Sequence, residues 1–407
     1  MNDLLNKLQS MGLKIEKGSD IHPEPNNRIS IDKLVKGEWL ESQGKRIFIY
    51  RYVYPFGSSH GNVLFENELR YKNLSQFWGI KNLGTYNLND FLFIDTETSG
   101  LSLGTGTIVF MFGGCFFTEM GLEVTQFFLD DPSNEALFLA NIDELILNHK
   151  CLVSYNGKSF DVPMLRSRMV LNRMPYINLY KDHLDLLYFA RMIWKLRLES
   201  RRLANIEREI LDFQRVEDEV PGWLVPQLYQ DFISSGDATP LKGVFYHNEK
   251  DIVSLAALFA HINKMISDQE TMDSSNGLDI ISIASIFQRS GNLSLSEEFY
   301  ELGLEKGLPD KINHKILRNY AKVMKKLAKW PEAIKLWEIA ADKNDPESCI
   351  ELAKYYEHNV QDYHHALEWI ETAMLIINET SDNTNFLEKL DHRKKRLESK
   401  INSRYEK

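Results

Sequence analysis

Two acidic residues that follow a short apolar run have a type and a spacing suited to metal-ion chemistry. Asp95 and Glu97 come directly after the apolar residues 91–94. If this run forms a strand, side chains two positions apart point to the same side, so both carboxylates project from one face. Two such acids repel each other unless a cation lies between them, and Mg²⁺ prefers oxygen ligands of this kind. The pair predicts a divalent-metal site; an ordinary Asp-x-Glu on an exposed strand is the alternative.

A second group of candidate residues lies at 154–168, at an expected strand-to-helix junction. We expect the strand to end at Tyr155 and Asn156 to begin the helix. Phe160 is then expected to pack inward while Asp161 turns toward the opening at the strand ends, where α/β proteins bind ligands. The alternative is that Asn156 only caps the helix and Asp161 is an exposed acid of its first turn.

Polar and basic side chains around this junction are candidates for substrate contacts. Asn156 and Lys158 lie in the junction itself, and Arg166 and Arg168 follow in the expected helix. Phosphate groups are commonly bound by such side chains. The two arginines are equally well explained as solubilising charges on a helix.

The third group is a histidine and an aspartate on a late amphipathic segment. His247 and Asp251 are four residues apart in the helix expected over 246–265, so they lie on one helical face. Such a pair is ordinarily only a contact between side chains one turn apart on a helix surface. Together with the two other carboxylate groups, it combines a general base with a metal ligand.

Two further features compete for a functional interpretation. Asp185 is expected to lie with His183 on a helix over 182–198, where a surface or supporting acid is favoured over a metal ligand. The loop TSGLSLGTGT (98–107) lacks the Gly-Lys-Ser/Thr ending of a phosphate-binding P-loop. We expect this loop to lie beside the metal site and to let a substrate backbone approach.

The elements that must position these residues form an α/β domain at 89–265. Alternating and apolar patterns predict a mixed sheet flanked by helices, with three strands in a meander and later strands reached through helices. Before this domain, residues 1–88 are expected to form a helix and a β-rich lead-in. The expected elements are a helix at 1–20, strands at 47–55, 91–95, 108–117 and 123–130, a helix at 135–149 and a strand at 151–156.

Beyond a polar linker at 266–278, strand signals disappear and a repeat becomes visible. WPEAIKLWEIA (330–340) aligns with YHHALEWIETA (363–373) at an offset of 33 residues, and 293–305 is a weaker copy. This period predicts tetratricopeptide-like helical pairs over 279–402, with a non-repetitive helical bundle as the alternative. Repeat arrays of this kind bind other proteins through a concave surface, so a protein partner is expected there.

Composition narrows the class of protein further. The 407 residues carry a net charge of −10, which argues against a surface that coats nucleic acid or anionic membrane but leaves room for a local basic groove. Three scattered cysteines indicate neither a disulfide framework nor a thiolate zinc site, and they fit a reducing compartment. The apolar run at 108–117 is about half as long as a membrane span, and the N-terminus lacks the features of a signal peptide. We therefore expect a cytoplasmic protein without a membrane partner.

Taken in order, the three groups resemble the exonuclease motifs of the DEDD superfamily, whose fold is ribonuclease-H-like. The motifs are Asp-x-Glu on a first strand, Asn-x3-Phe-Asp at a strand-to-helix junction and His/Tyr-x(n)-Asp on a late helix, and the resemblance covers 88–265. LANIEREIL (203–211), VPGWLVPQLYQDF (220–232) and YHNEKDIVSL (246–255) more closely resemble the YprB-like bacterial branch. That branch also carries tetratricopeptide-like helices after its nuclease domain.

This resemblance implies a cofactor, a substrate and a set of catalytic residues. It implies a 3′→5′ exonuclease that hydrolyses single-stranded DNA or RNA with two Mg²⁺ or Mn²⁺ ions. Asp95, Glu97, Asp161 and Asp251 match its metal-binding carboxylates, and His247 matches its general base.

The general base is the one position where this chain departs from the pattern. The histidine-type branch places its histidine five residues before the last aspartate, where this chain has Tyr246. His247 has the four-residue spacing of the tyrosine-type branch, and we favour it because histidine accepts a proton near neutral pH. A binding module with weak or no nuclease activity, and an endonuclease on the same fold, are the alternative functions.

Overall fold

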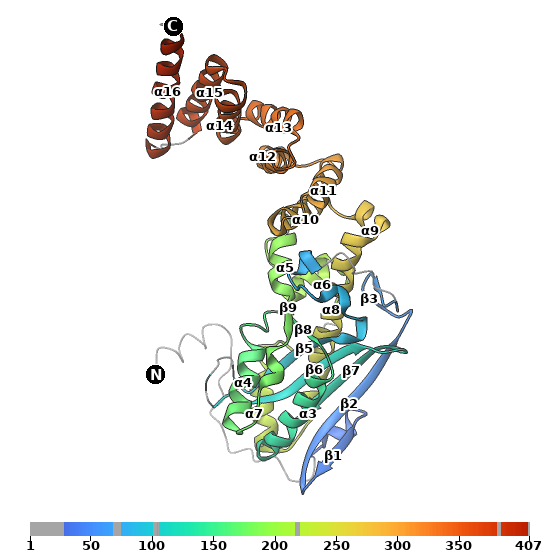
Figure 1. Cartoon of the computed structure of the whole chain (residues 1–407). Helices are drawn as coiled ribbons and strands as arrows, with labels where there is room; N and C mark the ends of the chain where they lie inside the picture. The colour runs from blue at the N-terminus through green and yellow to red at the C-terminus, as the bar shows by residue number, and fades with distance from the viewer. Residues whose placement is uncertain are drawn as a thin grey trace, which may run out of the picture.

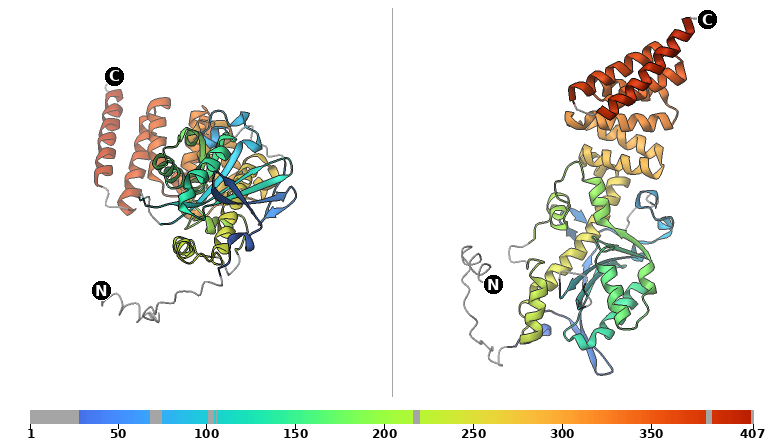
Figure 2. Two further views of the ribbon diagram at one scale, coloured as in Figure 1. Left: turned by 90° about the horizontal axis from the view of Figure 1, so that it is seen from below. Right: turned by 90° about the vertical axis from the view of Figure 1, so that its left-hand side faces the viewer.

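The computed structural model shows a sheet domain from which an arm of helices extends (Figures 1 and 2). The helix expected at 1–20 lies outside the described residues, as does part of the 98–107 loop. The structure describes residues 28–67, 75–100, 104, 106–215, 220–380 and 384–405.

The central element is a seven-stranded mixed sheet in the order β1-β2-β7-β6-β5-β8-β9. Strands β5, β6 and β7 form the predicted antiparallel meander, and β8 and β9 run parallel to β5. The lead-in strands β1 and β2 extend the same sheet along β7. Its strands are β1 (Glu38–Ser42), β2 (Lys45–Pro55), β5 (Phe91–Thr98), β6 (Val109–Phe117), β7 (Gly121–Phe128), β8 (Cys151–Ser154) and β9 (Asp182–Asp185), beside a hairpin of β3 (Ser59–His60) and β4 (Val63–Leu64).

Both faces of the sheet are covered, as expected for strands that are apolar at nearly every position. In β5, Phe91 and Phe93 contact Phe259 of α8, with ring centroids 4.9 and 5.6 Å apart. Leu92 and Ile94 belong to a second buried cluster on the other face, together with residues of α3 and α4. The covering helices are α3 (Glu135–Leu147), α4 (Asp161–Leu171), α5 (Leu186–Ile193) and α8 (Leu241–Ser267), with α2 (Ser75–Trp78), α6 (Leu203–Glu209) and α7 (Val225–Ser235) at the periphery.

The helix expected over 182–198 is partly wrong, because its first four residues form strand β9. Ser154 pairs with Asp185 in the ladder between β8 and β9, and Leu184 is buried. The helix α5 begins only at Leu186, where the Asp185 carboxylate caps it by accepting a hydrogen bond from the Leu187 amide. Four residues are too few for a helical and a strand pattern to be told apart.

The C-terminal region is all-helical in its described part. Consecutive helices pack as pairs, and the two aligned copies of the sequence repeat fall on α13 and α15. The repeated small residues Ala333, Ala340, Ala366 and Ala373 are all fully buried between helices. The helices are α10 (Gly277–Ser290), α11 (Leu293–Glu305), α12 (Asp310–Lys326), α13 (Trp330–Asp342), α14 (Pro346–Tyr355), α15 (Tyr363–Thr380) and α16 (Thr384–Tyr405).

The arm is joined to the sheet domain by packing as well as by the chain. Helix α10 contacts α5, and Arg197 forms an ion pair of 2.7 Å with the buried Asp279 of α10. The expected linker at 266–278 contains a short helix, α9 (Gln269–Ser274), and the domain boundaries stay a prediction. No helix in the described part of the chain is both long and apolar enough to cross a membrane.

Candidate active site

The two acids of β5 lie on the face of the sheet that α8 covers. Asp95 is held there by Asn248 of α8, whose side-chain amide donates to Asp95 Oδ2 at 2.9 Å. Gln126 in turn donates to Asn248 Oδ1 at 2.8 Å, so the amide orientation is fixed by a second strand. Asn248 is fully buried, and we did not predict it. Its signal in the sequence is an amide on the apolar face of a helix.

Gly113 of β6 is what lets α8 approach the sheet at this point. A Cβ built on Gly113 would lie 2.2 Å from Asn248 Oδ1, well inside contact distance. Any side chain here would displace Asn248 and, with it, the hydrogen bond to Asp95. Gly113, which interrupts an otherwise bulky strand, is therefore a requirement of this site.

Asp161, the first residue of α4, contacts the same end of β5 through Thr96. Its Oδ1 accepts hydrogen bonds from the amide and the hydroxyl of Thr96, at 3.1 and 2.5 Å. Asp161 is buried, so the alternative of an exposed first-turn acid is wrong. Gly157 lies so close to Asp161 that a Cβ at this position would be only 2.8 Å from Asp161 Oδ2.

Two details of this junction differ from our expectation. Asn156 does not begin the helix, because it has a positive φ of 69° and α4 starts only at Asp161. Phe160 does not pack inward, since 53% of it is exposed. The extra loop turns the chain so that Asp161, rather than Phe160, faces the sheet.

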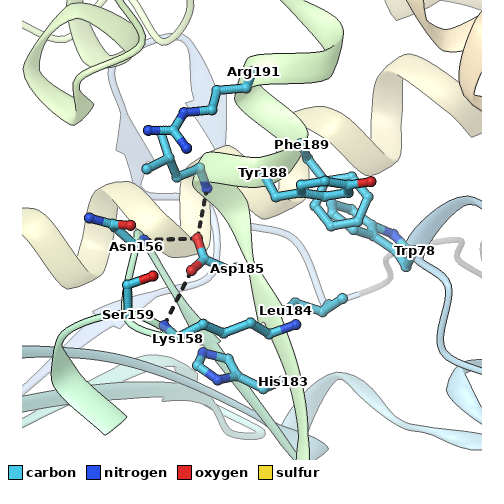
Figure 3. A pocket seen from close by; sticks show the side chains of 11 residues that line it. Trp78, Asn156, Lys158, Ser159, His183, Leu184, Asp185, Tyr188, Phe189 and Arg191 are labelled. Atoms are coloured by element: carbon cyan, nitrogen blue, oxygen red, sulfur yellow. Dashed lines mark hydrogen bonds between the residues drawn. The ribbon is translucent and has the colours of Figure 1, made fainter. Parts of the chain in front are cut away.

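Asp185 holds this loop in place and is not a surface acid. Its Oδ1 accepts from the Asn156 amide at 2.8 Å and from the Leu187 amide at 3.1 Å, while its Oδ2 accepts from the Lys158 amide at 3.2 Å (Figure 3). A carboxylate that accepts several backbone N–H bonds is strongly oriented. The supporting role favoured from the sequence fits this geometry, although the residue lies at a strand end and not on a helix.

The fourth acid, Asp251 on α8, is paired with an arginine that we did not predict. Arg215 donates to Asp251 Oδ1, and its Nη1 lies 3.2 Å from His247 Nδ1. Its other edge donates to both carboxylate oxygens of Glu207, each at 2.6 Å. Arg215 lies in the irregular segment after α6, which has no periodicity from which its position could be predicted.

The contact between Arg215 and His247 also defines how the imidazole of His247 is oriented. A guanidinium only donates, so His247 Nδ1 accepts and the ring proton of neutral His247 is assigned to Nε2, which lies 3.5 Å from Asp251 Oδ2. Tyr246 is placed differently, with its ring 5.1 Å from the Lys250 ammonium. The structure therefore brings His247 beside Asp251 and Tyr246 beside Lys250.

A buried polar chain connects the site to the lead-in segment. Glu207 accepts from the Ser254 hydroxyl at 2.6 Å, and Ser254 lies 2.8 Å from His60 Nε2 in β3. The neighbouring Asn62 donates its backbone N–H to the Leu211 carbonyl and its side-chain amide to the Ile210 carbonyl. Residues of the lead-in thus hold the segment that carries Arg215.

The electrostatics of the cluster favour a cation. Burial first, and then the charges of Asp251 and Asp161, hold the pKa of both Asp95 and Glu97 well above the usual range. Burial raises the pKa of Asp161 to about 6, against the lowering effect of the Thr96 hydrogen bonds. Arg215 offsets this repulsion at Glu97. The charges of acids on α4 and α8 thus act on the two acids of β5.

The residues present suit a divalent cation by donor type and charge. They offer hard carboxylate oxygens in a buried, electronegative position, which is the environment that Mg²⁺ or Mn²⁺ requires. As arranged, Asp251 is engaged by Arg215, and within the described residues no three His, Cys, Asp or Glu side chains are grouped closely enough to hold one ion. Of the basic candidates, Arg168 is engaged with Glu135 at 2.6 Å, while Lys158 and Arg166 are exposed.

The raised pKa of Asp161 predicts a pH-dependent effect of Asp161→Asn on the metal-free protein. Because the carboxyl has a folded-state pKa of about 6 and an unfolded value near ~3.9, its ionisation costs stability above about pH 6. The variant is expected to be more stable than the wild type at pH 7. This advantage should shrink as the pH falls through about 6 and disappear below about 4.

Denaturant unfolding of both proteins in EDTA across this range measures the effect. The buried histidines with lowered pKa values, whose protonation has the opposite influence, are common to both proteins and cancel in the difference; they are His60, His149, His183 and His261. A difference that stays constant with pH would contradict the prediction.

Comparisons with known proteins define first the class and then the family. The chain matches the RNase H superfamily over residues 92–263, which are the residues from β5 through most of α8. It is 32% identical to the uncharacterized protein YprB of Bacillus subtilis (strain 168) over 356 residues, covering 83% of this chain and 84% of that protein. The chain belongs to the YprB family.

Solved structures with a similar fold are more distant. A family B DNA polymerase from Pyrobaculum calidifontis matches 49% of this chain with 15% identity and a TM-score of 0.34, and the match spans 29% of the polymerase. E. coli exonuclease I in complex with an oligonucleotide matches 47% of this chain and 45% of its own, with 17% identity and a TM-score of 0.27. A product-bound exonuclease I matches 71% of this chain and 99% of its own, with 14% identity and a TM-score of 0.28.

Proposed function

We propose that this protein is a metal-dependent 3′→5′ exonuclease that hydrolyses phosphodiester bonds in single-stranded DNA or RNA. The observation that carries the proposal is the convergence of acids from β5, α4 and α8: burial, together with the charges of Asp251 and Asp161, raises the pKa of Asp95 and Glu97. Such an arrangement costs stability and persists in a protein when it binds a cation. The order of the three motifs along the chain supports the DEDD type of chemistry.

In this proposal each residue has a defined task. Asp95, Glu97, Asp161 and Asp251 would hold two Mg²⁺ or Mn²⁺ ions, which supply an activated water and stabilise the leaving oxygen. Thr96, Asn248 and Asp185 orient these ligands or the loop beside them. Asn156, Lys158 and Tyr246 would contact the substrate.

His247 is the proposed general base. It lies beside Asp251, and histidine is the side chain that most often acts as a general base. For that role Arg215 must release Nδ1. Its departure either frees the Nδ1 lone pair or lets the ring proton move to Nδ1 and leave Nε2 unprotonated, because only a ring nitrogen with a free lone pair accepts a proton. Movement of Arg215 away from Asp251 would also make that carboxylate available to a metal.

The experiment that tests the function is a cleavage assay with 5′-labelled single-stranded DNA and RNA in Mn²⁺, Mg²⁺ or EDTA. We expect a ladder of shortened 3′ ends that requires metal, and the Asp161→Asn variant, run in parallel, exposes any contaminating nuclease. Internal fragments would instead identify an endonuclease. If neither substrate is cut while metal binding is measurable, the nuclease proposal fails and recruitment of a protein partner through α10–α16 is favoured.

We also propose a cytoplasmic location, on the support of the cysteines. Cys115, Cys151 and Cys349 are all buried and unpaired in the described structure, as in a reducing compartment.

A further inference from the structure

A pocket of about 380 Å³ lies beside the loop that leads to Asp161 (Figure 3). Asn156, Lys158 and Ser159 of that loop line it, together with residues of β9 and α5. The loop is therefore shared between the pocket and the carboxylate cluster. Asp185, at the base of the pocket, is close enough to Asp161 for its charge to act on that residue. A ligand in the pocket would lie next to the proposed catalytic site.

One wall of the pocket is aromatic and presents an exposed ring. Tyr188 is 61% exposed, although it is a large side chain on a helix that is otherwise packed into the core. Its ring makes an edge contact of 5.4 Å with Phe189, and Phe189 packs on the buried Trp78 at 4.3 Å. Figure 3 shows these three rings together on one side of the pocket. Tyr188 is thus braced from behind while its own ring remains accessible.

Two cationic side chains also line the pocket. They are Lys158 and Arg191, and in the described part of the chain no carboxylate forms an ion pair with either of them. Asp185 is the one acid among the lining residues, and its two oxygens are engaged by three backbone N–H groups. This pocket therefore differs from the acidic cluster beside it and can accept an anionic group.

We propose that the pocket binds one nucleoside unit of a single-stranded nucleic acid, with the base against Tyr188 and the two adjoining phosphates at Lys158 and Arg191. An accessible ring beside cationic side chains is the combination that binds single strands without sequence preference. A volume of this size is at the lower end of small-ligand pockets and suits one nucleoside unit. The inference rests on the proposed function, because the neighbouring phosphodiester would then lie at the carboxylate cluster.

The test measures binding of a short 5′-fluorescein-labelled oligothymidylate in EDTA, so that no hydrolysis occurs. Tyr188→Ala is expected to weaken binding roughly tenfold, because it removes the stacking surface. Tyr188→Phe keeps the ring and should bind within about twofold of the wild type. Tyr52→Ala, which removes another half-exposed tyrosine from β2, is the matched control and should leave binding unchanged.

The salt dependence of the same binding tests the cationic walls. For single strands, each lost phosphate contact lowers the slope of log K against log salt by about 0.7. Arg191→Gln and Lys158→Gln are each expected to produce this change. Arg208→Gln, which removes an exposed arginine of α6 outside the pocket, should leave the slope as it is.

The outcomes separate this inference from the proposed function. If the wild type hydrolyses single strands with metal while Tyr188→Ala, folded by thermal unfolding, binds like the wild type, the pocket assignment is overturned and the nuclease stands. If binding depends on Tyr188 but no metal-dependent hydrolysis is found, the pocket stands and the nuclease fails. A wild type that neither binds nor cleaves single strands overturns both.

Discussion

Replacing Asp95 by asparagine is expected to make the metal-free protein more stable while it abolishes metal-dependent hydrolysis. Asp95 is partly buried, and burial and the charges of Asp251, Asp161 and Glu97 disfavour its charged form, whereas the hydrogen bond from Asn248 favours it. Asparagine has the same shape and keeps an oxygen that can accept from Asn248. We therefore expect a gain of about 1–2 kcal/mol in the free energy of unfolding in EDTA. Hydrolysis should fall by about a thousandfold or more, because a metal ligand is lost.

Metal addition gives this prediction a second readout. A ligand that binds only the folded state raises its stability by about 2.7 kcal/mol at a hundredfold excess over Kd. Thermal unfolding with and without Mn²⁺ should therefore show a large shift for the wild type and a much smaller one for Asp95→Asn. The two unfolding temperatures are expected to exchange their order when Mn²⁺ is added.

Asp279→Asn is the matched control for Asp95→Asn. Asp279 is also a buried carboxylate, but Arg197 neutralises it with an ion pair of 2.7 Å. Removing its charge leaves Arg197 partly unpaired and should destabilise the protein in EDTA and in Mn²⁺ alike. If Asp95→Asn also destabilises the metal-free protein, then Asp95 is a structural acid and the interpretation of the cluster as a cation site is contradicted.

The fold was predictable from the sequence where patterns were long. The meander of β5, β6 and β7, helix α3 and helix α8 all carry sustained apolar or amphipathic periodicity, and each lies where it was expected. The same patterns placed Asp95 and Glu97 on one strand face, because alternation in a strand is strictly two-fold. The coarse architecture, an RNase H-like sheet domain followed by helices, followed from that order of elements.

Short elements and irregular segments were not predictable in this way. The four residues of β9 are defined by pairing with β8, which is contact with a distant segment and leaves no local signal. The predictions for Asn156 and Phe160 were wrong because Asn156 has a positive φ. This conformation is stabilised by a hydrogen bond from the Asn156 amide to Asp185, 29 residues away, which leaves no local signal. Arg215 contacts Asp251 across 36 residues from a segment without periodicity.

Replacing Arg215 by methionine is expected to have the largest effect on stability. Arg215 forms two hydrogen bonds to Glu207, a residue that is 0% exposed, and a third to Asp251. Without the guanidinium, Glu207 is a buried charge, and among the described residues the Ser254 hydroxyl is the side-chain donor that remains to it. Breaking a buried pair from one side costs about 3–5 kcal/mol. Denaturant unfolding in EDTA should show a loss of this order.

The double variant Arg215→Met with Glu207→Gln measures how much of the loss in unfolding free energy comes from the interaction between Arg215 and Glu207. Glutamine stays hydrogen-bonded to Ser254 without carrying a charge, so the double variant should recover about 1–3 kcal/mol relative to the sum of the two single changes. Arg208→Met, which breaks an exposed ion pair with Glu209, should cost less than about 1 kcal/mol.

The Arg215→Met variant, compared with the wild type in Mn²⁺, also decides whether Arg215 competes with a metal at Asp251. If the guanidinium stands where a cation would act, Mn²⁺ should stabilise Arg215→Met more than it stabilises the wild type, because the metal then replaces a lost positive charge. An equal Mn²⁺ shift in both proteins would show that Arg215 supports the fold of the site without opposing the metal. Thermal unfolding at matched Mn²⁺ concentrations, with Arg208→Met as the reference, distinguishes these two roles.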